Sequence, residues 1–113
     1  MRIGIDAREL FGKTTGVGRY LTNLLIEWSG QCTIGYTFIL YSPSSEQHAV
    51  DLFTRLKLTN NPAFKHRSLE GGQGTWWEQS HLCKAANSDS LDVFFAPNYS
   101  APLMLQVPFV LAL

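Results

Sequence analysis

Residues 1–28 read MRIGIDARELFGKTTGVGRYLTNLLIEW, and this pattern predicts a strand, a glycine loop and a helix in that order. The run 2–6 is short and apolar and ends on a carboxylate, which is typical of a buried parallel strand. After the glycines, apolar side chains recur three and four residues apart, as on one face of a helix. They are Val17, Tyr20, Leu21, Leu24, Leu25 and Trp28, and the opposite face carries Arg19, Asn23 and Glu27. A strand that leads through glycines into a helix N-terminus is a common anion site in α/β proteins.

The rest of the chain continues the same alternation. Further strands are expected at 36–41, 64–69, 92–95 and from Pro108 onward, and helices from Ser45 to about Leu58 and from Thr75 to Ala86. The strand at 64–69 is polar, which suits the edge of a sheet. The alternation predicts one α/β domain, a three-layer fold with a mostly parallel sheet.

Length and charge narrow the function classes. The chain has 113 residues, with nine basic and nine acidic side chains and no basic cluster, which argues against a nucleic-acid partner. It contains no apolar run of the roughly 20 residues that a membrane span needs. Cys32 and Cys83 lie far apart without metal-ligand spacing, so reduced thiols are expected rather than a disulfide.

The glycine loop matches neither of the two common phosphate-binding motifs. Gly12-Lys13-Thr14 resembles the end of a P-loop, but Ala7 occupies the position of its first glycine. After Gly16 and Gly18, the third position of a dinucleotide fingerprint is occupied by Leu21. A two-glycine loop that opens a helix remains, and a turn that simply requires glycine would explain it equally well.

Several polar and aromatic side chains follow the predicted strands. Asp6 and Arg8 come directly after the first strand, where they could face a ligand crevice, pair with each other or cap the turn. Glu9 is the only other acidic residue near a predicted strand end, too few for a metal site or a two-carboxylate mechanism. Adjacent helical residues point about 100° apart, so at most one of Trp76 and Trp77 should face the core, and the other could cover a cleft. The three histidines show no metal-binding spacing, and a capping box is expected between Thr75 and Glu78.

Five motifs together resemble the start of the family 4 retaining glycosyltransferases, which have the GT-B fold. They are RIGIDAR at 2–8, TGVGRY at 15–20, FILYS at 38–42, GTWWEQ at 74–79 and DVFFAP at 92–97. The resemblance implies two facing Rossmann-like domains, of which the first mainly holds the acceptor and the second most of the nucleotide-sugar. By the same resemblance, Gly16, Val17 and Gly18 would reach the donor diphosphate. The acceptor side of the cleft would be lined by Asp6, Arg8, Arg19, Trp76, Asn98 and Tyr99.

The resemblance also has departures. The family usually carries a His-Asp dipeptide after its fifth strand, and none follows Pro108 here. Residues 1–113 are therefore expected to be an incomplete N-terminal domain, without the donor-binding domain and inactive alone. With the fifth strand poorly covered, Val110, Leu111 and Leu113 should favour self-association or instability.

The function expected of the parent enzyme follows from the resemblance. It would transfer a sugar from a nucleoside-diphosphate sugar to a hydroxyl of a glycan or lipid-linked acceptor, with retention and without a metal or other cofactor. It would work in the cytoplasm, with peripheral membrane association left open. The alternatives are a non-catalytic nucleotide- or sugar-binding Rossmann-like module and a protein-interaction domain.

Overall fold

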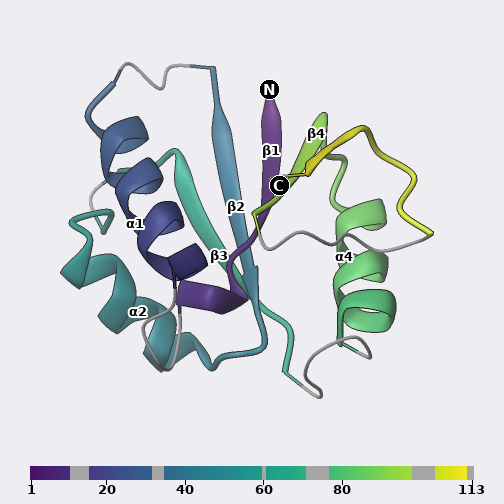
Figure 1. The fold of residues 1–113 in the computed structure, drawn as a ribbon, viewed down its shortest axis with the longest axis horizontal. Coiled ribbons are helices and arrows are strands. Elements are labelled where there is room, and N and C mark those ends of the chain that lie inside the picture. Colours follow the sequence, from purple (N-terminus) through teal and green to yellow (C-terminus); the bar gives the residue numbers. More distant parts are fainter. Residues whose placement is uncertain (11–15, 32–34, 60, 71–76, 98–103, 112–113) are drawn as a thin grey trace.

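A computed structural model describes residues 1–10, 16–31, 35–59, 61–70, 77–97 and 104–111. Its sheet contains five parallel strands in the order β3-β2-β1-β4-β5 (Figure 1). The strands are β1 (Arg2–Asp6), β2 (Thr37–Ser42), β3 (Phe64–Ser68), β4 (Val93–Ala96) and β5 (Phe109–Leu111). This is the strand order of a Rossmann-like domain, in which the order reverses beside the first strand. The predicted α/β class, the parallel pairing and the edge position of the third strand are confirmed.

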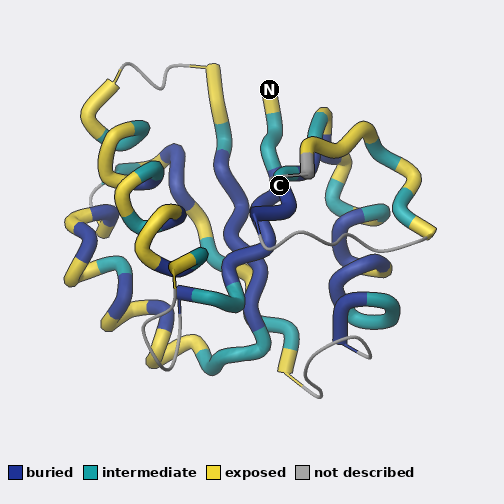
Figure 2. Tube along the Cα trace, viewed as in Figure 1, coloured by how far each residue is buried: buried dark blue, intermediate teal, exposed yellow. Residues whose placement is uncertain are grey.

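Helices cover both faces of the sheet. One face carries α1 (Gly16–Ser29) and α2 (Glu46–Arg55), and the other carries the π-helical turn η2 (Glu78–Leu82) and α4 (Cys83–Ser88) (Figure 1). A short 3-10 turn, η1 (Arg8–Leu10), follows β1. Alternate β2 side chains divide between two cores, because successive strand residues point to opposite faces. Phe38 and Leu40 join the α1–α2 core, whereas Ile39 and Tyr41 join the α4 core. Figure 2 shows the buried sheet between the partly exposed helices.

Helix α1 follows the predicted pattern with one exception. Leu21 and Leu25 are fully buried, and Trp28 packs against the same core. The polar face is exposed as predicted. Tyr20, predicted on the apolar face, is instead 50% exposed. It lies at the margin of the apolar stripe, next to exposed Arg19, so the ring is not enclosed by the sheet.

Two helix boundaries differ from the prediction. Helix α2 begins as expected, with the Ser45 hydroxyl accepting a hydrogen bond from the His48 N–H at 3.4 Å. It ends at Arg55 rather than near Leu58, because Lys57 adopts a left-handed conformation with φ of 60°. Leu58 is nevertheless fully buried, which explains why the apolar pattern continued past the helix. The helix expected from Thr75 is described only from Trp77 onward, and its stretch Glu78–Leu82 is π-helical.

Gly4 lets β1 lie close to the α4 side of the sheet. A Cβ at this position would overlap the Leu91 side chain and approach Phe94 and Tyr41 to 3.0 and 3.1 Å. These rings belong to the core beneath α4. Close packing in the α4 core therefore favours glycine at this position of the first strand.

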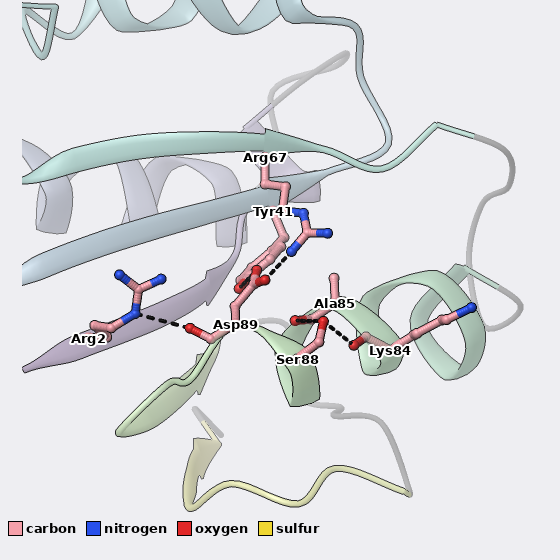
Figure 3. A network of polar contacts seen from close by, with 7 residues as sticks. All are labelled: Arg2, Tyr41, Arg67, Lys84, Ala85, Ser88 and Asp89. Carbon is pink, nitrogen blue, oxygen red and sulfur yellow. Dashed lines mark hydrogen bonds and ion pairs between the residues drawn. The ribbon is translucent and has the colours of Figure 1, made fainter.

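A polar network attaches the end of α4 to the strands (Figure 3). The Tyr41 hydroxyl donates to the Asp89 carboxylate at 2.6 Å, and the Arg67 guanidinium pairs with the same carboxylate. The Arg2 Nε donates to the Asp89 backbone carbonyl at 3.0 Å. Burial and the neighbouring Asp89 carboxylate raise the pKa of Tyr41, so its phenol remains a hydrogen-bond donor. Every one of these groups is engaged within the fold, and we assign the network a structural role.

Candidate functional site

The candidate site lies at the carboxyl edge of the sheet, where the strand order reverses. Strands β1 and β4 are neighbours there, with Ile5 opposite Phe95, and they end at Asp6 and Ala96. Helix α1 begins at this edge, close to where β1 runs into η1 (Figure 1). Open α/β sheets bind their ligands in the crevice at such a point, because the adjoining loops diverge to opposite faces.

An ion cluster fixes the segment that leaves β1. The Arg8 Nη2 lies 3.1 Å from the Asp6 Oδ2 and 2.7 Å from the Glu78 Oε1. The Arg8 backbone N–H donates to the Asp6 Oδ1 at 3.3 Å, and its guanidinium lies 5.5 Å from the centre of the Trp77 ring. Asp6 is 1% exposed and Glu78 is 4% exposed. One guanidinium thus compensates two buried carboxylates and joins η1 to the start of η2.

The position of Asp6 changes its acidity. Burial raises the pKa of its carboxyl from 3.8 to about 6, and Glu78 and Glu9 add to the rise. The Arg8 charge and its backbone N–H oppose this effect but do not cancel it. Removing a carboxylate from water disfavours its charged form, which is the largest of these contributions. Asp6 therefore exchanges its proton close to neutral pH.

Gly16 is the exposed first residue of α1. A Cβ built on it meets no atom of the described residues within 4 Å, and within the same part of the chain only Gly35 is a glycine with a positive φ. Neither its own backbone conformation nor packing against the described residues therefore requires glycine at position 16. The alternative that the loop needs glycine only for its turn stays a prediction, because residues 11–15 lie outside the described residues. Gly18 is buried within α1, and Val17 is partly buried.

The structure places the remaining predicted site residues as follows. Arg19 is exposed on α1. Trp77 is fully buried, and Trp76, Asn98 and Tyr99 lie outside the described residues. Asp6 and Arg8 pair with each other, which is one of the alternatives that the sequence left open for them. The pair lies at the carboxyl edge of the sheet, where a ligand crevice was predicted.

Sequence reasoning missed Glu78. It assigned this residue to a capping box and counted only Asp6 and Glu9 near strand ends, whereas the structure brings Glu78 to Arg8, 70 residues earlier in the chain. A signal was present, because the helix that precedes a parallel strand begins at the carboxyl edge of the sheet. An acidic residue in the first turn of that helix is therefore a candidate neighbour of Asp6. The Thr75 side of the capping box lies outside the described residues.

A second polar pair lies at the other end of the carboxyl edge. The Ser42 hydroxyl is 2.7 Å from the His66 Nε2, and burial lowers the pKa of His66 against the opposing effect of Glu46. Beside it, a hollow of about 220 Å³ lies between α2 and β3. It is lined by Glu46, Ala49, Val50, Phe53, Thr59 and His66. Ser42 is fully buried, so its hydroxyl is not placed to attack a substrate in this hollow.

Metal sites, reactive cysteines and membrane-spanning helices were also considered within the described part of the chain. It contains no group of three His, Cys, Asp or Glu side chains that could hold a metal ion. Cys83 is a buried free thiol, as predicted for this residue. No helix among the described residues has the length and apolar character to cross a membrane.

Comparison with known proteins gives no relative: no family model matches the chain, and no curated protein or solved structure matches it significantly. The fold is that of a Rossmann-like domain, and its function must be inferred from the residues at the carboxyl edge.

Proposed function

We propose that this chain is the acceptor-side domain of a retaining glycosyltransferase that uses a nucleoside-diphosphate sugar. The observation that carries the proposal is Gly16, an exposed helix-opening glycine at the carboxyl edge that neither its φ nor its packing against the described residues requires. A diphosphate can approach backbone N–H groups closely where a side chain is missing. The resemblance of five motifs to family 4 glycosyltransferases supports the same assignment.

In the proposed reaction, the bond between the sugar's anomeric carbon and the donor diphosphate breaks, and a bond to the acceptor oxygen forms on the same face. The proton of the acceptor hydroxyl passes to the departing diphosphate, which leaves as the nucleoside diphosphate. Negative charge develops on that leaving group, so fixed N–H groups aimed at it lower the barrier. The α1 N-terminus would supply such groups, and its dipole alone would contribute roughly 0.3–2 kcal/mol.

The ion cluster has a supporting part in this proposal. By holding η1 against the start of η2, Arg8 and its two carboxylates fix the chain that enters the glycine loop. A fixed entry to a binding loop would reduce the conformational freedom that is lost when the donor binds. Arg8 and Arg19 would border the acceptor. A lipid-linked acceptor would place the enzyme at the inner face of a membrane, whereas a free glycan would not.

Calorimetric titration of the chain with UDP, GDP and ADP tests the anion site. We expect weak, millimolar binding, since an exposed helix terminus is screened by water and salt. Gly16→Val should abolish it. Gly30→Ala is the control at the other end of α1, where a Cβ would meet only ordinary contacts of 3.6 Å or more. Equal binding by Gly16→Val and the unmodified chain, or no binding up to about 10 mM nucleotide, would remove the loop from the proposal.

Sugar transfer distinguishes the proposal from a non-catalytic nucleotide- or sugar-binding module. The donor's leaving group and the acceptor are to be held by opposite walls of a cleft, and this chain is proposed to supply one wall. We therefore expect no transfer by the 113-residue chain alone in an assay with nucleotide-sugars and simple acceptors. Adding the facing domain should produce transfer that Gly16→Val reduces strongly. Diphosphate binding without transfer in the two-domain protein would instead identify the non-catalytic module.

A further inference from the structure

The hollow between α2 and β3 combines one face of the helix with the edge strand of the sheet. Its helical wall consists of four α2 residues that share one helix face, spaced three and four positions apart: Glu46, Ala49, Val50 and Phe53. His66 of β3 and Thr59, which follows α2, complete the lining. Ala49 is buried, and Phe53 packs against the α1–α2 core. The apolar side of the hollow is therefore held in place by the core.

Glu46 carries the only charge among the residues that line this hollow. Burial lowers the pKa of His66, so its imidazole is neutral at neutral pH. None of the ion pairs in the described part of the chain involves the Glu46 carboxylate. Lys65 and Arg67 flank His66 in β3 and therefore point to the opposite face of the sheet, where Arg67 pairs with Asp89. A cation that enters the hollow from solution thus meets a negative charge and no positive one in its lining.

Aromatic rings share the hollow with this carboxylate. The rings of Phe53 and His66 both line it, with their centroids 6.5 Å apart and their planes nearly perpendicular. The face of an aromatic ring attracts a cation within about 6 Å, and organic ammonium ions are commonly recognised in this way. An acidic residue in the first turn of a helix is stabilising by itself. The combination of Glu46 with aromatic and apolar surface is therefore what points to a ligand.

We propose that the hollow between α2 and β3 binds a small organic ammonium ion, whose charged group faces Glu46 and whose apolar body lies against Val50 and Phe53. Its volume of about 220 Å³ suits a single ring with a short ammonium-bearing arm, since a cavity of about 150 Å³ holds benzene. Glu46 and Val50 are exposed, so we expect a dissociation constant in the millimolar range. This site is independent of the proposed function, which concerns an anion at the start of α1.

Benzylamine is a suitable probe, because it joins one ring to one ammonium group, and benzyl alcohol is its neutral counterpart of similar shape. Titration of the ¹⁵N-labelled chain with each compound, followed by the amide chemical shifts, gives the location and the dissociation constant. We expect benzylamine to shift the amides of residues 46–53 and of His66. Benzyl alcohol should bind about threefold to fivefold more weakly, since it lacks the charge that an exposed carboxylate attracts.

Two variants with circular dichroism to confirm folding complete the test. Glu46→Gln should raise the dissociation constant for benzylamine about threefold to fivefold, and Phe53→Leu, which keeps an apolar side chain but removes the ring, about twofold to fivefold. Glu27→Gln, the same change at an exposed position of α1, is the control and should leave it unchanged. The proposal would be overturned by equal binding of benzyl alcohol and benzylamine, by a Glu46→Gln variant that binds as the unmodified chain does, by shifts outside the hollow, or by no shifts up to about 50 mM benzylamine.

Discussion

Asp6 is a carboxylate that is almost fully buried, and burial disfavours its charged form. Its pKa is raised from 3.8 to about 6, so the folded protein holds this proton more tightly than the unfolded chain does. Its stabilising contribution is therefore complete below the unfolded pKa and is lost as the pH rises through about 6. Over that window the loss amounts to roughly 3 kcal/mol.

Asp6→Asn should remove this pH dependence, because the amide carries no proton to release. Urea unfolding of both proteins at about pH 4.5 and about pH 7.5 measures it. From the lower to the higher pH, the unmodified protein should lose about 2 kcal/mol of unfolding free energy relative to the Asp6→Asn variant. A difference that stays constant with pH would show that Asp6 titrates at its ordinary value.

Arg8 compensates two buried carboxylates, so its loss should be costly. Arg8→Met would leave Asp6 and Glu78 without their shared cation, and we expect it to lower the unfolding free energy by roughly 3–5 kcal/mol at neutral pH. Arg19→Met, the same change at an exposed position of α1, should have an effect within about 0.5 kcal/mol. Chemical denaturation compares the two, and equal losses would mean that the ion cluster adds nothing to stability.

At the scale of elements, β1 is held close to the α4 core by Gly4. Gly4→Ala places a methyl group against Leu91, Phe94 and Tyr41, and such overpacking typically costs about 1–3 kcal/mol. Gly16→Ala is the control, because a Cβ there meets nothing within 4 Å. Thermal unfolding should separate the two variants clearly. An unchanged melting temperature for Gly4→Ala would show that the core can shift to accommodate the methyl group.

The helix and strand boundaries were predicted well where the local pattern of apolar and turn residues determines them. The bounds of β1 match the prediction, and α1 begins and ends within a residue or two of it, because apolar periodicity and flanking turn residues are local signals. The end of α2 was wrong, since the left-handed Lys57 interrupts an apolar pattern that continues to Leu58. The π-helical form of η2 has no signal in residue spacing. The pairing of Arg8 with Glu78 was missed because it joins residues 70 positions apart.

At the scale of the whole molecule, the alternation of strands and helices was enough to predict the parallel α/β class. Local pattern does not determine the strand order, because that order depends on which strands meet after long crossovers. The observed order is what places the end of β1, the ion cluster and the α1 N-terminus at one edge. The position of Asp6, Arg8 and Gly16 at this edge was therefore predictable from the sequence, whereas the electrostatics of Asp6 became visible only in the fold.

The central claim is that this edge binds the diphosphate of a nucleotide at the start of α1. The most direct measurement is a titration of the ¹⁵N-labelled chain with UDP, followed by the amide chemical shifts. We predict the largest shifts at Gly16, Val17 and Gly18, smaller ones at Arg8, and none at Gly30 or β5. Shifts confined to the hollow lined by Val50 and His66, or no shifts at millimolar UDP, would contradict it.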